Sequence, residues 1–487
     1  MFNFEKIINI FCFEVNTNFV ASKLFFKYFS LILLVLCEIT LDIVFAIKFQ
    51  GFVEIYFLLT SFLAVVILSC VNFVIKKKEL LVPWFAVFLF FPLVGSVLYF
   101  VFCGKIISSN KVKKKIENEK TNNEKFFQTK AKYYAWGKDF FEDVKKRIKK
   151  AKNFIFFEFY ILESGKLFDE LIEVVKEKIV NGVEVYMLID EIGSLNKLPK
   201  SFLTDMKNIG IKCQKFQGLT TGLLHNNRDH RKIVVVDGNV AFLGGVNLAD
   251  EYVGKKQKYG VWKDGGVKVE GEVARNFAKS FCAMFTLSSN KIRCPKIDED
   301  KCEKIVGDGL AKSLFFTPSC VGEKTKAECE IINLIDEAKT EIKISTPYFI
   351  PDDDIQEALQ RASIRGARVK IFVPGIADKK LVNLVTKSYY QCQLERGIEI
   401  FEFEKGFIHS KNILIDNSSM LVGTINLDYR SFFRNFECGV IVKNSQAARQ
   451  LANDFSELEK SCKKIELKDV PKTRLIIKIL RFFAPIL

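Results

Sequence analysis

Two long runs of apolar residues without any charge lie near the start of the chain. They cover residues 56–75 and 81–103, and a short charged segment, 76–79, separates them. A helix of about 20 apolar residues crosses the roughly 30 Å hydrocarbon core of a bilayer. The pattern therefore predicts a tight hairpin of two membrane-spanning helices.

A third apolar run, residues 28–46, contains two acidic residues. Glu38 and Asp42 are four residues apart, so on a helix they share one face and are expected to point toward other helices. We expect two or three membrane-spanning helices within residues 1–107, the alternative for this first run being a helix that lies in the interface. A cleaved signal peptide is not expected, because further spans follow and no small-residue cleavage site is evident.

The remainder of the chain alternates helical and strand patterns. A polar, basic linker at 108–132 leads into it, and whether its lysines contact anionic headgroups or only water is left open. Phe140, Val144 and Ile148 recur at helical spacing, an apolar strand follows at 153–161, and a further helix and strand end at Asp190. This β-α-β order predicts an α/β fold, a sheet with helical crossovers.

The same order of patterns occurs twice. Segment 151–161 resembles 338–350 (338 − 151 = 187), and segment 182–190 resembles 366–375 (366 − 182 = 184). Two copies of one α/β unit, at 133–300 and 301–470, are therefore expected to form a pseudo-dimer.

A basic, apolar tail covers residues 471–487. Its apolar residues Ile476, Ile479, Leu480 and Phe483 recur at helical spacing, opposite Arg474, Lys478 and Arg481. This pattern predicts a short amphipathic helix that docks on the bilayer surface or packs on the preceding domain.

Composition restricts the chemistry. The 487 residues include 73 Lys and Arg against 57 Asp and Glu, a net charge of +16, and 49% are apolar, which excludes a disordered chain. The 13 cysteines form no CxxC pair, which argues against a zinc ribbon or a secreted disulfide scaffold and for free thiols. Only three histidines are present, so histidine chemistry must use them.

Two of the three histidines begin the same motif, H-x-K-x4-D-x6-G-(G/T)-x-N. The motif residues are His230, Lys232, Asp237 and Asn247 in the first copy and His409, Lys411, Asp416 and Asn426 in the second. Such a long pattern rarely recurs by chance. The third histidine, His225, lies outside the motif and is expected to be a solvated loop residue, with contact to a lipid headgroup as the alternative.

The motif residue types suit a phosphate group. His and Lys two residues apart lie on one face of a strand, and imidazole, ammonium and amide groups hold phosphate oxygens and neutralise developing charge. One histidine can attack phosphorus while the other protonates the leaving alcohol. Asp237 and Asp416 stand at turns with the opposite parity, so we expect them to act mainly through structure, although they belong to the catalytic motif.

A nucleophilic histidine needs an acid that holds its second ring nitrogen. Glu437, eleven residues after Asn426, is expected to serve His409, and Asp264, seventeen residues after Asn247, is the comparable candidate for His230. The unequal spacing weakens this parallel, and ordinary structural acids remain the alternative. Tyr160 and Tyr348 end matching strands and either line the site or pack beside it.

The paired motifs resemble those of the phospholipase D superfamily. The apolar hairpin with the segment at 83–105 and the contexts "DHRKIVVVDG" and "HSKNILID" are similar to those of bacterial cardiolipin synthases, from about residue 55 to the C-terminus. The resemblance implies transfer of a phosphatidyl group between two phosphatidylglycerol molecules through a phosphatidyl-histidine, without metal or cofactor. The resemblance favours His230 as the nucleophile and His409 as the general acid, whereas the more convincing orienting acid, Glu437, favours His409 as the nucleophile, so the sequence leaves both assignments open.

Other functions remain open at this point. They are a phosphatidylserine synthase, a hydrolytic phospholipase, a nuclease favoured by the positive charge, and a non-catalytic membrane scaffold. The predicted spans favour phosphatidylglycerol and other anionic membrane lipids over nucleic acid as partners, and a cell-membrane location. With three spans, residues 76–78 lie on the face opposite residue 104 onward, and unpaired thiols favour a cytoplasmic catalytic part.

Overall fold

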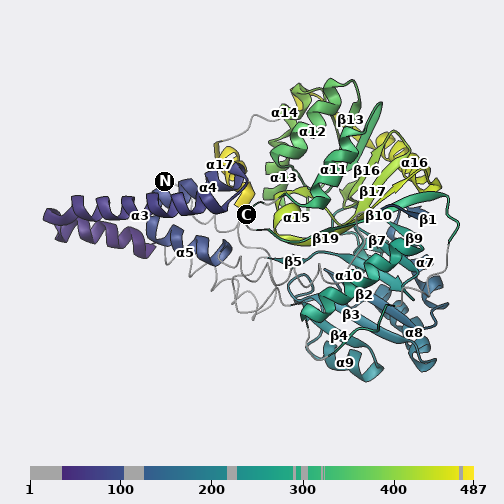
Figure 1. The fold of residues 1–487 in the computed structure, drawn as a ribbon. Coiled ribbons are helices and arrows are strands. Elements are labelled where there is room, and N and C mark those ends of the chain that lie inside the picture. Colours follow the sequence, from purple (N-terminus) through teal and green to yellow (C-terminus); the bar gives the residue numbers. More distant parts are fainter. Residues whose placement is uncertain are drawn as a thin grey trace. The chain divides into compact units, whose positions relative to one another are not determined.

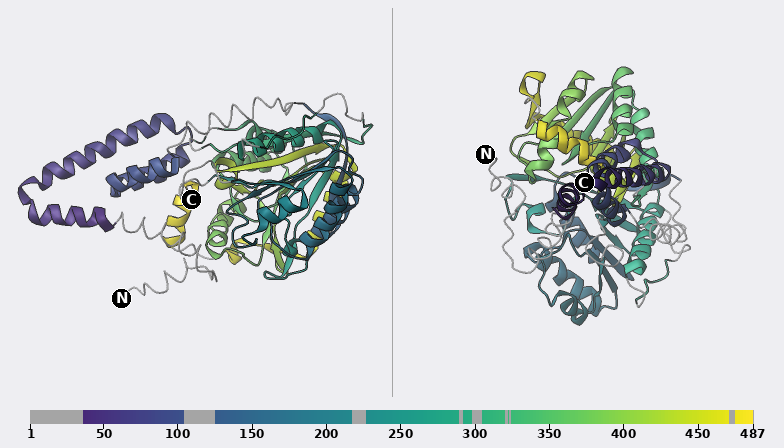
Figure 2. Two further views of the ribbon diagram at one scale, coloured as in Figure 1. Left: turned by 90° about the horizontal axis from the view of Figure 1, so that it is seen from below. Right: turned by 90° about the vertical axis from the view of Figure 1, so that its left-hand side faces the viewer.

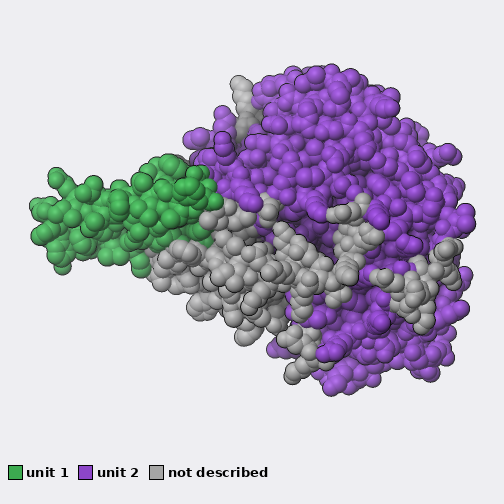
Figure 3. All heavy atoms as spheres, in the orientation of Figure 1, with its two compact units in different colours: residues 1–74, 84–104, 221–224 green, residues 75–83, 105–220, 225–487 purple. Residues whose placement is uncertain are grey.

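The computed structural model describes residues 36–103, 125–216, 227–288, 292–297, 305–319, 322, 324–470 and 475–486. The chain divides into two compact units (Figure 3): unit 1 holds residues 1–74, 84–104 and 221–224, and unit 2 holds residues 75–83, 105–220 and 225–487. The expectations for residues 1–27, for most of the linker and for His225 lie outside the described residues.

The apolar N-terminal part forms helices at residues 36–48, α3 (Val53–Val74), α4 (Lys78–Phe90) and α5 (Pro92–Cys103), with a short turn of helix, η1 (Gln50–Phe52), before α3. Among the described residues, one helix is long and apolar enough to cross a membrane, Gln50–Phe73. The expectation of two or three such helices is therefore not met by the described residues.

The second apolar run is not one continuous helix, as we had expected. It breaks at Phe91, before Pro92, which lacks the N–H that a continuing helix would need. At 1.5 Å per residue, α4 and α5 are about 20 Å and about 18 Å long, and neither spans the hydrocarbon core. The rings of Trp84 and Tyr99 lie 5.2 Å apart, so the two helices fold back on each other.

The two acids of the first apolar run do face other helices, as predicted. The carboxylate of Glu38 is buried and accepts the backbone N–H groups of Leu93 and Val94, both at 2.9 Å, at the start of α5. These N–H groups have no partner within their own helix, so the carboxylate caps it. Asp42 accepts a hydrogen bond of 2.6 Å from the hydroxyl of Tyr56 in α3.

Unit 2 contains two α/β repeats (Figure 1). The first consists of β1 (Phe127–Tyr134), α7 (Gly137–Ile148), β2 (Phe154–Phe159), α8 (Lys166–Val180), β3 (Glu184–Asp190), α9 (Phe202–Ile209), β4 (Lys212–Phe216), β5 (Arg228–Asp229), β6 (Lys232–Val236), β7 (Val240–Gly244), η2 (Asp250–Val253), β8 (Val261–Lys263), β9 (Gly266–Glu270) and α10 (Glu272–Ser288).

The second repeat consists of β10 (Gly309–Phe316), α11 (Lys326–Asp336), β11 (Glu341–Ser345), β12 (Phe349–Ile350), α12 (Asp353–Ile364), β13 (Arg368–Pro374), α13 (Lys380–Lys387), α14 (Tyr390–Glu395), β14 (Glu399–Phe403), β15 (Gly406–Ile408), β16 (Asn412–Ile415), β17 (Ser419–Gly423), β18 (Leu427–Asp428), α15 (Tyr429–Phe433), β19 (Asn435–Lys443), α16 (Gln446–Lys460) and β20 (Cys462–Ile465). After η3 (Leu467–Asp469), the tail forms α17 (Leu475–Phe483) and η4 (Ala484–Ile486).

The repeats share one mixed sheet with a pseudo-two-fold order. From the centre outward, the first repeat runs β1-β9-β7-β6-β2-β3-β4 and the second runs β10-β19-β17-β16-β11-β13-β14. The central strands β1 and β10 pair antiparallel, with Gln128 opposite Leu310. Helices lie on both sides of the strands (Figure 2). The pseudo-dimer expected from the sequence is therefore the observed architecture of unit 2.

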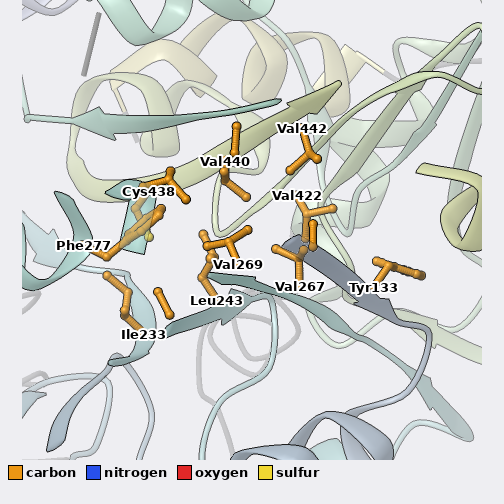
Figure 4. Close-up of a cluster of buried hydrophobic side chains, with 14 of the residues drawn as sticks. Tyr133, Ile233, Leu243, Val267, Val269, Phe277, Val422, Cys438, Val440 and Val442 are labelled. Carbon is orange, nitrogen blue, oxygen red and sulfur yellow. The ribbon is translucent and has the colours of Figure 1, made fainter. Parts of the chain in front are cut away.

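One apolar core spans both repeats (Figure 4). Alternate residues of the strands, such as Val267 and Val269 in β9 and Val440 and Val442 in β19, point to the same face. Phe277 of α10 and Leu451 of α16 pack in the same cluster. Because this core is continuous between the two copies, it fixes their motifs relative to each other.

One predicted boundary needs correction, and the tail adopts one of its two expected positions. Strand β1 begins at Phe127, inside the predicted linker 108–132, because its alternating side chains pair with β9 and β10. In the tail, the guanidinium of Arg481 stacks 3.9 Å from the ring of Tyr389 and donates to the carbonyl of Ser388. The tail helix thus packs on unit 2 through its basic side and leaves Leu475, Ile476 and Ile479 exposed.

Candidate active site

Each motif histidine lies just before an inner strand of the sheet. His230 precedes β6 and His409 precedes β16. The backbone N–H of His230 donates to the carbonyl of Phe436, and that of His409 donates to the carbonyl of Lys263, at 3.0 and 2.8 Å. Each histidine is thus held against the other repeat, because β5 pairs with β19 and β15 pairs with β8.

The orienting acids cross between the repeats. Nδ1 of His230 lies 2.9 Å from Oε1 of Glu437, and Nδ1 of His409 lies 2.6 Å from Oδ2 of Asp264. The expectation that each acid serves the histidine of its own repeat is therefore wrong. It fails because the parallel pairing of β5 with β19 and of β15 with β8 carries each acid past its own motif to the partner histidine.

The two acids occupy equivalent positions despite their unequal spacing from the motifs. Gly244 of β7 pairs with Gly266 of β9, and Gly423 of β17 pairs with Gly439 of β19. Asp264 and Glu437 each stand two residues before the second glycine of these pairs. The longer spacing in the first repeat lies in the loop that contains η2 and β8, so it does not shift the acid.

The two motifs differ at one position, which is Gly245 in the first repeat and Thr424 in the second. This difference corresponds to the different lengths of the neighbouring acids, Asp264 and Glu437. A Cβ at Gly245 would lie 2.3 Å from Oδ1 of Asp264, so only glycine leaves room for this shorter acid. In the second repeat, the hydroxyl of Thr424 instead donates to Oε2 of Glu437. Each residue at this position therefore fits the acid beside it.

Two residues that hold Glu437 were missed by the sequence analysis. The hydroxyl of Ser431 donates to Oε1 at 2.9 Å, and the side-chain amide of Asn435 donates to the same oxygen at 3.1 Å. Both lie within eleven residues after Asn426. Their polar types beside a buried acid are the signal that could have identified them.

The motif lysines lie in equivalent, buried surroundings. The ammonium of Lys232 donates to the carbonyl of His230, and that of Lys411 donates to the carbonyl of His409. Burial lowers the pKa of Lys232 to about 8 and that of Lys411 to about 7. Glu437 and Asp264 both act on each of the two lysines, so the two motifs form one electrostatic site.

Both histidines are held in the neutral form. Burial lowers the pKa of His409 to about 3, with Lys411 adding to this effect and Asp264 opposing it. Burial also lowers the pKa of His230 well below its usual value, and here the nearby cations Lys232, Lys411, Lys379 and Arg430 reinforce it. Because its carboxylate partner binds Nδ1, each neutral imidazole has Nε2 left for chemistry.

The motif aspartates do not join this cluster. Asp237 accepts the backbone N–H groups of residues 152–154 before β2, and Asp416 accepts those of residues 339–341 before β11. Both have positive φ, 53° and 49°, at the turns after β6 and β16. They tie the far end of each motif strand to its neighbour, which agrees with the expected structural role.

The motif asparagines differ from each other. The amide of Asn247 accepts from the backbone N–H of Ile161 at 2.9 Å and donates to the hydroxyl of Tyr252 at 2.7 Å. The oxygen and one N–H of this amide thus have partners within the protein, and the contact of Asn247 with phosphate stays a prediction for its second N–H. Asn426 is buried, and among the described residues its Oδ1 has no hydrogen-bond partner.

Aromatic rings surround the histidines. The ring of Tyr160 lies 4.8 Å from that of His230, and those of Tyr252 and Trp262 each lie 5.4 Å from that of His409. Tyr160 thus lines the site, whereas the hydroxyl of Tyr348 donates to Asp378 at 2.6 Å. These rings provide apolar walls that exclude water from the imidazoles.

Comparison with known proteins identifies the paired repeats. A family model described as a cardiolipin synthase, phospholipase D-like domain matches residues 144–284 and 331–459. A cardiolipin synthase of Halalkalibacterium halodurans is 32% identical over 410 residues, covering 76% of this chain and 81% of its own length. A cardiolipin synthase of Clostridium perfringens is 30% identical over 451 residues, covering 83% and 93%.

Two further similarities concern relatedness and fold. An uncharacterised protein of Streptococcus mutans is 34% identical over 365 residues, covering 74% of this chain and 79% of its own length. The crystal structure of a phosphatidylserine synthase from Haemophilus influenzae superimposes with a TM-score of 0.55 at 14% identity, covering 77% of this chain and 98% of that one. At this identity the superposition shows a shared fold.

Proposed function

This chain belongs to the cardiolipin synthase family of phospholipase D-like proteins, and we propose that it transfers a phosphatidyl group from one phosphatidylglycerol to another, releasing glycerol and cardiolipin. The observation that carries the proposal is the crossed arrangement of the two histidines and their acids. It puts two neutral imidazoles and two ammonium groups into one buried site. Such a site suits covalent transfer at a phosphodiester.

The first step forms a covalent intermediate on His230. Glu437 accepts a hydrogen bond from Nδ1–H of His230, which keeps the proton on Nδ1 and leaves the lone pair on Nε2 to attack phosphorus. The bond from phosphorus to the glycerol oxygen breaks. His409, which takes up a proton on Nε2 when the anionic substrate binds beside it, donates that proton to the glycerol oxygen. Lys232 and Lys411 neutralise the charge that develops on the phosphoryl oxygens.

The second step reverses the proton flow. A hydroxyl of a second phosphatidylglycerol attacks the same phosphorus, and its proton goes to Nε2 of His409. The bond between phosphorus and Nε2 of His230 breaks, which returns the lone pair to His230 and releases cardiolipin. Asn426, with its unpartnered buried oxygen, is the candidate for a contact with substrate.

The charge around each histidine supports this division of roles. Four cations disfavour the charged form of His230. Lys411 and Lys232 disfavour the charged form of His409 as well, but there Asp264 opposes them. A nucleophile must be neutral and a general acid must carry a proton. The phosphate anion of the bound substrate adds negative charge beside both, which raises the pKa of His409 toward the value that an acid needs.

The chain is proposed to lie in the cell membrane with its catalytic unit at the cytoplasmic face. Residues 75–83 and the chain from residue 105 onward belong largely to one compact unit. This membership favours an arrangement in which both ends of segment 84–104 lie on one side of the bilayer, in place of the three spans expected from the sequence. We propose that α3 crosses the membrane and that residues 84–104 enter and leave it on the same face.

Incubation with phosphatidylglycerol vesicles in the presence of a chelator tests the reaction. Cardiolipin and glycerol are expected in equal amounts, since each transfer releases one molecule of each. Phosphatidic acid as the main product would indicate a hydrolase and contradict the proposal. Cleavage of single-stranded DNA by the same preparation would indicate a nuclease.

A further inference from the structure

The short charged segment between the two apolar runs is built into the second repeat. The ammonium of Lys77 lies 2.8 Å from Oε1 of Glu328 and 2.8 Å from Oδ2 of Asp354, and it also pairs with Asp352. The side chains of Glu328 and Asp352 are completely buried, and that of Lys77 is 9% exposed. In the described part of the chain, these three acids are the one group close enough to share a metal ion, and the ammonium lies among them instead.

The same segment contacts helix α15. The ammonium of Lys77 lies 4.8 Å from the ring centre of Phe433, and Glu79 accepts a hydrogen bond of 2.6 Å from the hydroxyl of Tyr429. Both ring residues belong to α15, which has only five residues. Because so short a helix has little stability of its own, its position depends on contacts such as these.

The central residue of α15 holds Glu437, the acid that orients His230. Ser431 lies between Tyr429 and Phe433, and its hydroxyl donates to Glu437 at 2.9 Å while accepting from the backbone N–H of Asn426 at 3.2 Å. A continuous series of contacts thus runs from the charged segment through α15 to Glu437 and then to His230.

We propose that Lys77 and Glu79 are positioning residues for the active site, which hold α15 so that Ser431 keeps Glu437 against His230. The proposal rests on the proposed function, because it assigns Glu437 and His230 their roles. Residues 75–83 connect α3 to residues 84–104. The connection between the segments proposed to enter the membrane would thereby determine the position of Glu437 relative to His230.

Displacement of α15 has a predictable electrostatic effect. Burial raises the pKa of Glu437 to about 7, and the hydroxyls and amide that donate to it, including Ser431, hold it down. The charged or titratable groups that act on Glu437 or respond to it are His230, Lys232, Lys411, Asp428, Tyr160 and Cys438. Loss of the Ser431 donor raises the pKa of Glu437 further, so the acid loses its charge at a higher pH.

The test compares Lys77→Met, Lys77→Arg and Tyr429→Phe in the full chain, with Lys78→Met as the control. Lys78 is exposed and belongs to the same segment. We expect kcat to fall at least tenfold in Lys77→Met with KM changed less than twofold, and the acid limb of the kcat profile to move to higher pH. Lys77→Arg should recover most of the rate, and Tyr429→Phe should shift the profile in the same direction by less.

Hydrogen exchange separates this inference from the proposed reaction. Peptides covering residues 426–437 should exchange faster in Lys77→Met and in Tyr429→Phe than in the wild-type chain, whatever lipid product the enzyme makes. If Lys77→Met fails to fold, Tyr429→Phe, which lacks a single hydroxyl, decides the matter. Wild-type exchange together with a wild-type kcat and pH profile in a folded variant would overturn the inference.

Discussion

Replacement of Glu437 by Gln perturbs the central contact of the proposed mechanism with little change of shape. The carboxylate is fully buried and accepts hydrogen bonds from His230, Thr424, Ser431 and Asn435. An amide nitrogen facing Nδ1 of His230 can only donate, so the imidazole proton moves to Nε2. The lone pair that attacks phosphorus is then lost.

The expected loss of rate is large. Exchange of an orienting carboxylate for an amide, which leaves the wrong histidine tautomer, costs about 10⁴-fold in kcat, equivalent to about 5 kcal/mol of transition-state stabilisation. Stability should change in the opposite direction. Burial raises the pKa of Glu437 from 4.5 to about 7, so the folded state loses stability as pH rises through that range, by up to about 3 kcal/mol.

The assay measures cardiolipin formation from phosphatidylglycerol and the thermal unfolding midpoint of the same preparation at pH 7.5. Glu437→Gln should lose about four orders of magnitude in rate while its midpoint stays equal to or above that of the wild-type chain. Glu437→Asp keeps the charge and serves as the matched variant, with a smaller loss of rate. A Glu437→Gln variant that is folded and retains more than a tenth of the activity would refute the role of this acid.

Three other changes test separate parts of the structure. Gly245→Ala should lower the rate at least 100-fold without changing the fold, because its Cβ would displace Asp264. The control is Gly51→Ala, whose Cβ would have no heavy atom within 4 Å. Equal rates in these two variants would contradict the role of Asp264. Asp416→Ala should lower the free energy of unfolding by about 2 kcal/mol, because three backbone N–H groups lose their acceptor, while kcat of the folded protein stays unchanged. Burial acts against the charged carboxylate, but these hydrogen bonds lower the pKa of Asp416, so the wild-type chain loses their contribution to stability only at acidic pH. An unfolding midpoint of the variant equal to that of the wild-type chain would contradict this prediction. In a cysteine-free chain, a membrane-impermeant thiol reagent should label Lys78→Cys and Ile106→Cys from one side and Gly51→Cys from the other, whereas joint labelling of Gly51→Cys and Ile106→Cys would restore the three-span arrangement.

The architecture of unit 2 was predictable because each repeat shows the same local sequence patterns in the same order. Alternating apolar segments and the paired motifs indicated two α/β copies, and the structure has them side by side in one sheet. The acids of the first apolar run were also placed correctly, since the spacing of Glu38 and Asp42 defines a helix face.

The crossed acids could not be predicted from spacing along the chain. Which histidine Glu437 reaches depends on the pairing of β5 with β19, a contact between segments about 200 residues apart. The same holds for Lys77, whose partners Glu328 and Asp352 come from the second repeat. The length of an apolar run likewise could not reveal the break at Phe91, for which Pro92 was the available signal in the sequence.

The most direct test of the account is to identify the residue that carries the phosphatidyl group. A phosphatidyl ester with a p-nitrophenol leaving group needs no proton from a general acid, so the His409→Ala variant should form the intermediate and then fail to pass it to an acceptor hydroxyl. The account predicts that rapid quenching and peptide mass spectrometry find one phosphatidyl group on His230. A phosphatidyl group on another residue, or rapid cardiolipin formation by this variant, would contradict it.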